Sequence, residues 1–263
     1  MGRFHDDTAV TKLDESLWRG EIREGWRIGA VPNGGYVLSI GARALSEALP
    51  QPDPMTITAY YMAPTVLGPI DCRVEELGGG RSTSFGQVRL EQDGQLKALI
   101  TGAFTDLNAL TGEDWQAVKR PEYPPLDDCE LLPKGPLEFR QNLDQFLCHG
   151  GQVFTGGEPD GSGEFRGWLR HADGTATDLI SLLLFADCFP PPAFNVFGVA
   201  GWVPTVELTV QLRAHPAPGP VQARLYSHFM TGGVVEEDGE YWDSEGKLVA
   251  VSRQTAKFRR PKG

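Results

Sequence analysis

The sequence predicts an α+β fold in which one helix-and-sheet arrangement occurs twice. Three observations support this: turn signals that recur about 150 residues apart, strand-like alternation, and one apolar helix-like segment in each half. The 263 residues are enough for two domains of ordinary size. We therefore expect two modules, each with an antiparallel sheet wrapped around one central helix.

The repeat is clearest in the glycine-containing turns. Each half places a segment of the pattern Gly-Glu-x-Arg before its helix-like stretch and three further turns after it. The matching pairs are Gly20–Trp26 with Gly163–Trp168, Gly68-Pro69 with Gly219-Pro220, Gly78–Gly80 with Gly232-Gly233, and Asp93-Gly94 with the turn ending at Gly246. Each half thus reads as one strand, one helix and four strands separated by turns.

Helix signals stand at corresponding places in the two halves. Asn33 is a plausible N-cap for the first helix, after which apolar residues recur every three to four positions. In the second half Thr175 is the expected cap and Asp178 stands in the first turn. Residues 179–186 are apolar almost throughout, and Pro190–Pro192 forbid continuation. A helix that is apolar all round is buried.

Residues 107–136 separate the halves. This segment is rich in proline and scattered charge, which disfavours both helix and central strand and is typical of a stiff linker. We therefore expect an N-terminal domain at 1–106, a linker at 107–136 and a C-terminal domain at 137–263.

Composition excludes several classes of function. The net charge of −11 argues against a nucleic-acid partner, which would require a basic face. No segment is long and apolar enough to span a membrane or to act as a secretory signal, so we expect no membrane partner and a cytoplasmic location. No metal-ligand spacing is present, and the cysteines are scattered without a CxxC pair: Cys72, Cys129, Cys148 and Cys188.

Several motifs across both halves resemble acyl-CoA thioesterase II-type proteins, which are double-hotdog enzymes. The resemblance is weakest in the linker. The motifs that carry it are Trp26–Tyr36, Tyr60–Pro64, Gly80–Ser82, Gln92–Gly94, Phe185–Asp187, Pro204–Val206 and Ser252–Gln254. It implies a tandem hotdog fold and hydrolysis of an acyl-CoA to free acid and coenzyme A. It also implies no cofactor, and either a monomer or a homodimer.

The resemblance further implies three catalytic positions. In that family an Asp, a Thr or Ser and a Gln of the second hotdog hold the attacking water, and the matching residues here are Asp187, Thr205 and Gln254. A thioester is already activated, so a positioned water, a carboxylate to accept its proton and donors for the oxyanion suffice.

The start of the first helix is the expected substrate-binding element. Asn33, Gly34 and Gly35 stand at its N-terminus, where free backbone N–H groups and the helix dipole would favour the oxyanion. Glycine would let the thioester approach closely, although a glycine pair equally permits tight helix packing.

Each catalytic candidate also has a purely structural interpretation. Asp187 follows an apolar helix at its negative end, an unfavourable place for a carboxylate unless it faces solvent. Gln254 shares a strand face with small or apolar residues, as would a structural amide bonded to the backbone. Strict alternation puts Thr205 opposite the apolar face, and a bulge at Pro204 would re-aim it.

The repeat also predicts how many sites the chain carries. At the repeat offset Gln254 aligns with Gly102, Thr205 with Thr56, and Asp187 falls near Leu45. The first half lacks the set of polar residues, so we expect one active site per chain.

The sequence also allows two alternative functions. A hotdog enoyl-CoA hydratase or dehydratase usually relies on a histidine paired with a carboxylate, and none of the five histidines stands at a helix entry. A non-catalytic acyl-CoA-binding protein would use the same pocket. The basic C-terminal residues would meet coenzyme A phosphates or form a solvated end; they are Arg253, Lys257, Arg259, Arg260 and Lys262.

Overall fold

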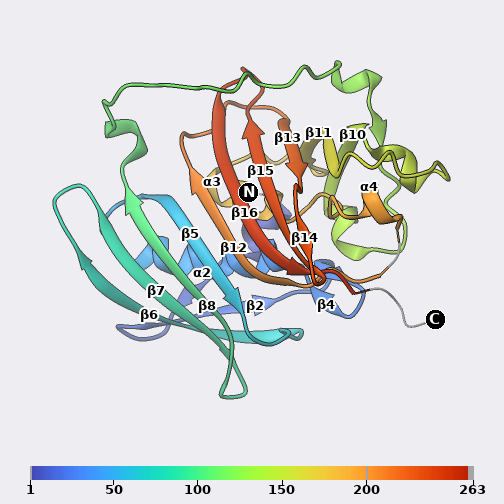
Figure 1. The fold of residues 1–263 in the computed structure, drawn as a ribbon. Coiled ribbons are helices and arrows are strands. Elements are labelled where there is room, and N and C mark those ends of the chain that lie inside the picture. The colour runs from blue at the N-terminus through green and yellow to red at the C-terminus, as the bar shows by residue number, and fades with distance from the viewer. Residues whose placement is uncertain (1, 200, 260–263) are drawn as a thin grey trace.

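The computed structural model describes residues 2–199 and 201–259. The first half consists of one long helix and a strongly curved sheet (Figure 1). Its main elements are β2 (Leu17–Ile22), α2 (Gly34–Ala48), β5 (Asp53–Tyr61), β6 (Gly68–Gly79), β7 (Ser84–Gln92) and β8 (Gln95–Thr105). Short elements precede α2, namely α1 (Arg3–Asp7), β1 (Thr11–Lys12), β3 (Arg27–Ile28) and β4 (Val31–Pro32).

The second half repeats the pattern with a shorter helix. Its main elements are β10 (Leu143–His149), β11 (Glu164–His171), α3 (Leu179–Phe185), β12 (Thr205–Leu212), β13 (Val221–Tyr226), β15 (Val234–Trp242) and β16 (Leu248–Lys257). Smaller pieces are β9 (Glu130–Leu131), α4 (Phe194–Phe197), β14 (Met230–Thr231) and the 3₁₀ turns η1 (Leu107–Ala109), η2 (Leu126–Asp128), η3 (Glu138–Asn142) and η4 (Gly151–Phe154).

One antiparallel sheet runs through both halves. The strand order β2-β6-β7-β8-β5 of the first half matches β11-β13-β15-β16-β12 of the second, and β5 pairs with β12 at the centre. Thr58 lies directly opposite Thr209, and their hydroxyl oxygens are 2.8 Å apart. These two residues hold equivalent places in the repeat, so the pseudo-twofold axis passes between them. The predicted double hotdog is confirmed.

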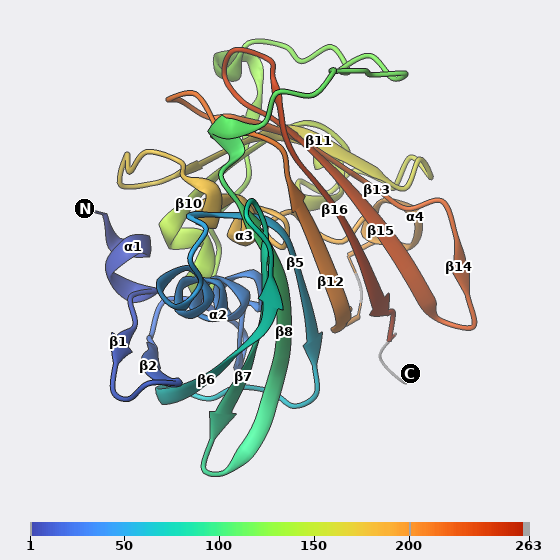
Figure 2. The same ribbon diagram turned by 90° about the vertical axis from the view of Figure 1, so that its left-hand side faces the viewer.

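The two helices pack against each other and are enclosed by the curved sheet. Figure 2 shows β6, β7, β8 and β5 bending around α2. Gly41 permits the close approach, because a Cβ there would lie 2.4 Å from Ile100 Cδ1 of β8. All residues of α3 are buried, as the all-apolar pattern predicted.

The helix caps agree with the sequence in the first half and differ in the second. Asn33 caps α2, and its side chain accepts a hydrogen bond from Tyr36 N. The expected cap at Thr175 is wrong, because Asp178 caps α3 and accepts from Ser181 N at 2.7 Å. Asp178 therefore ends the loop and does not stand in the first helical turn.

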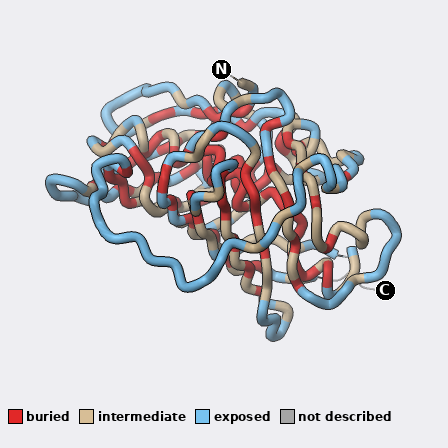
Figure 3. Tube along the Cα trace, turned by 90° about the horizontal axis from the view of Figure 1, so that it is seen from above, coloured by how far each residue is buried: buried red, intermediate tan, exposed pale blue. Residues whose placement is uncertain are grey.

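Residues 107–136, the predicted linker, cross one end of the molecule (Figure 1). Within this segment only short elements form, namely η1, η2 and β9, and β9 pairs with β10. In the molecule as a whole, buried residues are concentrated in the centre and exposed loops surround them (Figure 3). The domain boundaries at 106 and 137 stay a prediction.

Candidate active site

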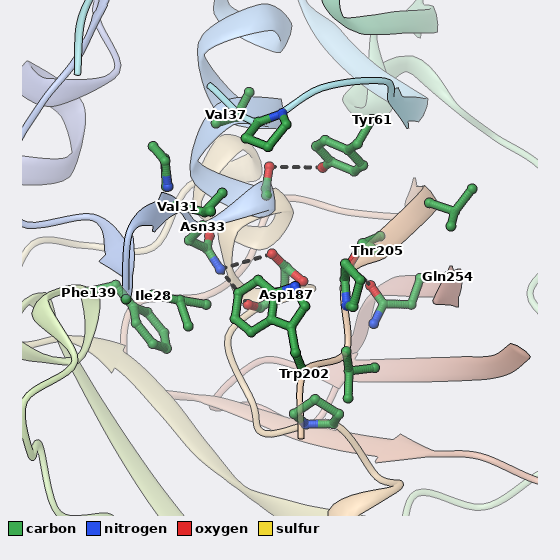
Figure 4. A pocket seen from close by; sticks show the side chains of 18 of the residues that line it. Ile28, Val31, Asn33, Val37, Tyr61, Phe139, Asp187, Trp202, Thr205 and Gln254 are labelled. Carbon is green, nitrogen blue, oxygen red and sulfur yellow. Dashed lines mark hydrogen bonds between the residues drawn. The ribbon is translucent and has the colours of Figure 1, made fainter. Parts of the chain in front are cut away.

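A cavity of ≈ 880 Å³ opens where the two halves meet. Its walls come from the loop before α2, the end of β5, the segment between α3 and β12, and the inner faces of β15 and β16. Figure 4 shows Asp187, Thr205 and Gln254 around the same space, with Trp202 close by. The structure therefore brings the three predicted catalytic residues to one cavity.

Asp187 is held by the N-terminus of the other half's helix. Its Oδ2 accepts hydrogen bonds from Asn33 Nδ2 and from Gly35 N, both at 2.9 Å. Asn33 Nδ2 also donates to the Asp187 carbonyl oxygen at 2.7 Å. Asp187 follows the negative end of α3, but it also faces the positive end of α2, where a carboxylate is favoured. The carboxylate is thus fixed in place and not freely solvated.

The surroundings tune the basicity of this carboxylate. Burial raises the pKa of Asp187 from 3.8 to about 6, although hydrogen bonds from Gly35, Gly34 and Asn33 lower it. Desolvation is the largest effect because it penalises the charged form more than these donors stabilise it. Asp187 is consequently ionised at neutral pH but more basic than an ordinary aspartate, which suits a general base.

The backbone N–H groups at the start of α2 are not free. Gly35 N binds the Asp187 carboxylate, and Gly34 N also stabilises it. The expectation that both N–H groups await an oxyanion is therefore wrong, because an internal anion already occupies the helix N-terminus. Asn33 and Gly34 line the cavity, whereas Gly35 lies behind it.

The two glycines at this point have different neighbours. A Cβ on Gly35 would lie 2.9 Å from the carbonyl oxygens of Leu183 and Leu184 in α3. A Cβ on Gly34 would lie 3.0 Å from Asp187 Oδ2 and 3.2 Å from the Tyr61 hydroxyl oxygen. Gly35 thus lets the two helices meet, and Gly34 leaves room at the carboxylate.

A bulge in β12 turns Thr205 toward Gln254. The pairing of β12 with β16 shifts between Thr205 and Glu207, so Val206 is the extra residue of the bulge. The Thr205 hydroxyl lies 3.3 Å from Gln254 Oε1, to which it donates. The sequence predicted a bulge at Pro204 for the same reason, and the structure places it two residues later.

Two further cavity residues were missed by the sequence analysis. Tyr61 donates its hydroxyl hydrogen to Gly34 O at 2.9 Å, and burial raises its pKa well above 10. Glu237 of β15 is only 5% exposed. The signal for Glu237 was the alternation of Val235, Glu237 and Tyr241, which places all three on the inner face of the strand.

Four cationic side chains also line the cavity, although the protein is acidic overall. They are Lys97, Arg140, Lys257 and Arg259. In the described part of the chain, none of the four forms an ion pair with a carboxylate. Of the basic C-terminal residues, Lys257 and Arg259 face the cavity, Arg253 pairs with Asp238, and Arg260 and Lys262 lie outside the described residues.

The position in the first half that is equivalent to Gln254 has no room for a polar side chain. Gln254 pairs with Leu208 as Gly102 pairs with Ile57, so the predicted alignment of Gln254 with Gly102 is correct. A Cβ on Gly102 would lie 2.6 Å from Ile57 Cδ1, which leaves no room for a polar side chain.

The alignment of Thr205 with Thr56 is wrong. Thr205 pairs with Ala256 as Pro54 pairs with Phe104, which makes Pro54 the counterpart.

At the opposite end of the helix pair, the N-cap Asp178 meets Arg43, with 3.5 Å between Oδ2 and the guanidinium. That end carries an ion pair where the first end carries Asn33 and Asp187.

Comparison with known proteins agrees with the class that the fold indicates, a double-hotdog thioester hydrolase. The family model of the acyl-CoA thioesterase N-terminal domain matches residues 22–105, and that of the C-terminal domain matches residues 117–258. The chain belongs to this acyl-CoA thioesterase family.

Individual relatives cover nearly the whole chain. It is 25% identical to the thioesterase-like protein TwmA of Talaromyces wortmannii, over 96% of this chain and 91% of that one. A solved structure from Thermobifida fusca YX, provisionally described as a thioesterase II, has 28% identity and a TM-score of 0.91, with 99% and 98% of the two chains covered. Acyl-CoA thioesterase II TesB2 of Mycobacterium marinum has 18% identity, a TM-score of 0.78 and 99% coverage of both chains, which shows the fold.

Two features are absent from the described residues. None of the helices in residues 2–199 and 201–259 is long and apolar enough to cross a membrane. The same residues contain no group of three or more His, Cys, Asp or Glu side chains placed to hold a metal ion.

The two glycines at the start of α2 provide a matched pair of variants. Gly35→Ala should lower the melting temperature, at a cost of about 1–3 kcal/mol, because its Cβ meets backbone oxygens that cannot move aside. Gly34→Ala meets only side-chain atoms and should fold with nearly wild-type stability. Its hydrolysis rate should nevertheless fall about tenfold or more, because Asp187 is displaced. Equal melting temperatures for the two variants would contradict this assignment.

Proposed function

We propose that the protein hydrolyses an acyl-CoA to the free acid and coenzyme A, with one active site per chain. The observation that carries this proposal is the Asp187 carboxylate, held at the N-terminus of α2 and tuned to a pKa of about 6 inside a cavity. Thr205 and Gln254 line the same cavity as a hydrogen-bonded pair. This set supplies a base and polar groups that orient a water.

Asp187 acts as the general base in this proposal. Asn33 and Gly35 both donate to Oδ2, so lone pairs of Oδ1 remain to accept a hydrogen bond from a water. Asp187 takes a proton from this water as its oxygen attacks the thioester carbonyl carbon. Thr205 and Gln254 orient the water and the carbonyl oxygen, on which negative charge develops.

The leaving group requires little help. A thiol ionises near pH 8.5, so a thiolate can depart from the tetrahedral intermediate at neutral pH without a dedicated acid. The proton on Asp187 then passes to solvent or to the thiolate. The reaction consumes water only, and no cofactor is required.

The cavity has the two kinds of wall that an acyl-CoA needs. Apolar side chains at its lining include Ile28, Val31, Val37, Phe189 and Trp202, which suit the acyl group. The cations Lys97, Lys257, Arg140 and Arg259, which form no ion pair among the described residues, suit the phosphates of coenzyme A. This local basic surface offsets the net charge of −11. The proposed binding partner is therefore the acyl-CoA substrate. The protein would bind it as a monomer or as a homodimer.

The alternatives have less support. None of the described residues that line the cavity is a histidine, so a hydratase or dehydratase would lack its usual acid–base pair. A non-catalytic acyl-CoA-binding protein would gain nothing from a desolvated carboxylate held by two donors, because that arrangement costs stability.

A thiol-release assay tests the proposed reaction. Purified wild type should release thiol from at least one of a panel of short, medium, long and aromatic acyl-CoAs. Asp187→Asn should lower kcat by about a hundredfold or more, within the usual range for acid–base groups. If the wild type binds acyl-CoA yet releases no thiol from any of them, the protein is a binder and the proposal fails.

The pH profile tests how Asp187 is held. In the wild type kcat should rise with pH through about 6, where Asp187 loses its proton. Asn33→Asp keeps the acceptor that caps Tyr36 N, but it removes both hydrogen bonds from Asn33 Nδ2 to Asp187 and adds a like charge. The rise should therefore move up by about one pH unit or more. An unchanged profile in this variant would show that Asp187 is not the titrating base.

Stability should change in the opposite direction to activity. Folding raises the pKa of Asp187 from 3.8 to about 6. The contribution of Asp187 to the free energy of unfolding is therefore fully present below pH 4 and is lost as the pH rises through 6. The shift corresponds to up to about 3 kcal/mol at pH 8. Asp187→Asn removes this cost, so its gain in unfolding free energy should be about 1 kcal/mol larger at pH 8 than at pH 5. Denaturant melts at both pH values measure it, and a gain that does not grow with pH contradicts the raised pKa.

A further inference from the structure

Glu237 is a buried carboxyl group that the proposed reaction leaves without a role. It lies in the middle of β15 on the inner face, is 5% exposed and lines the cavity. An ionised carboxylate at such a place is costly unless a cation pairs with it. Among the described residues Glu237 forms no ion pair, although its neighbour Asp238 on the outer face pairs with Arg253.

The groups around Glu237 favour its protonated form. Burial and the nearby charges of Asp187 and Asp238 raise its pKa well above 4.5, and a hydrogen bond with Gln254 opposes them only in part. Tyr241 on the same strand face, and Cys188 beside Asp187, are themselves kept neutral by burial. These surroundings therefore favour the protonated form of Glu237, and a negative charge on Asp187 favours it further.

Glu237 is paired with a residue of the proposed catalytic set. In the antiparallel pair of β15 with β16 it lies directly opposite Gln254, both side chains line the cavity, and Gln254 lowers the pKa of Glu237 as a hydrogen-bond donor does. Gln254 Oε1 accepts from the Thr205 hydroxyl at 3.3 Å. The amide nitrogen of Gln254 is then the group that binds Glu237. One hydrogen-bonded row thus runs from Thr205 through Gln254 to Glu237 and fixes both ends of the amide.

We propose that Glu237 is a positioning residue, which holds the Gln254 amide in the orientation that directs its second N–H toward the substrate carbonyl. This inference rests on the proposed thioesterase function. Without the Glu237 contact only the Thr205 hydroxyl would hold the Gln254 amide. A donor that is fixed at both ends costs less reorganisation during the reaction than one that is held at one end. Ionisation of Glu237 would place a second negative charge in the cavity and oppose the developing oxyanion.

Three variants test the inference when assayed beside the wild type and Asp187→Asn. Glu237→Leu should lower kcat about tenfold or more with a smaller change in KM, because Gln254 loses its partner. Glu237→Gln keeps an acceptor and should recover most of the lost rate. Because it cannot ionise, it should also lack any loss of kcat with rising pH that comes from ionisation of Glu237. Asp238→Asn, which changes the adjacent outward-facing carboxylate, should behave like the wild type; melting temperatures confirm that all variants fold.

The outcomes separate the two proposals. If the wild type releases thiol, Asp187→Asn does not, and Glu237→Leu matches the wild type, this inference alone is overturned. If Glu237→Gln is as slow as Glu237→Leu, Glu237 transfers a proton and is not a positioning residue. If the wild type itself releases no thiol, both proposals fall.

Discussion

The contact between the start of α2 and the Asp187 carboxylate is the interaction on which the rest of the site depends. It joins a helix of the first half to a residue of the second, with a hydrogen bond of 2.9 Å from Gly35 N to Oδ2. The two halves must therefore meet before the site exists. The packing that allows this contact leaves no room for a Cβ at Gly35, and the cap at Asn33 supplies the second donor.

Duplication of a fold supplies two places for a site, and the polar residues of the proposed site stand at only one of them in the described part of the chain. The pseudo-twofold axis relates the two ends of the helix pair, yet Asn33 faces Asp187 at one end while Arg43 faces Asp178 at the other. The Asp178 carboxylate is instead engaged by its own helix, because its Oδ1 accepts from the Ser181 N–H and the Ser181 hydroxyl. Gly102 stands where Gln254 stands in the other half, with apolar atoms in the space.

Much of the fold could be predicted because both halves of the repeat carry the same local sequence signals. Glycine turns, one apolar helix in each half and the cap at Asn33 depend on near neighbours in the chain, and they gave the helices, the strand pattern and the double hotdog. The cap of α3 was misplaced because Thr175 and Asp178 are both good caps, and packing decides between them.

Residue types and the family resemblance predicted which residues belong to the site, but not how they contact one another. Neither shows that Asp187 meets the helix of the other half, because that contact spans 152 positions of the sequence. The same limit explains the error about free N–H groups at Gly34 and Gly35. Glu237 was overlooked because it sits in a run of acidic residues that looks like a solvated edge, and only the register with Gln254 shows its place.

Burial raises the basicity of Asp187, and the N-terminus of α2 keeps it ionisable near neutral pH. The most direct test is an infrared titration of the carboxyl groups, with the spectrum of Asp187→Asn subtracted from that of the wild type. The structure predicts one carboxyl that loses its proton with a pKa of about 6. A difference signal that titrates near pH 4, as an exposed aspartate does, would contradict the account.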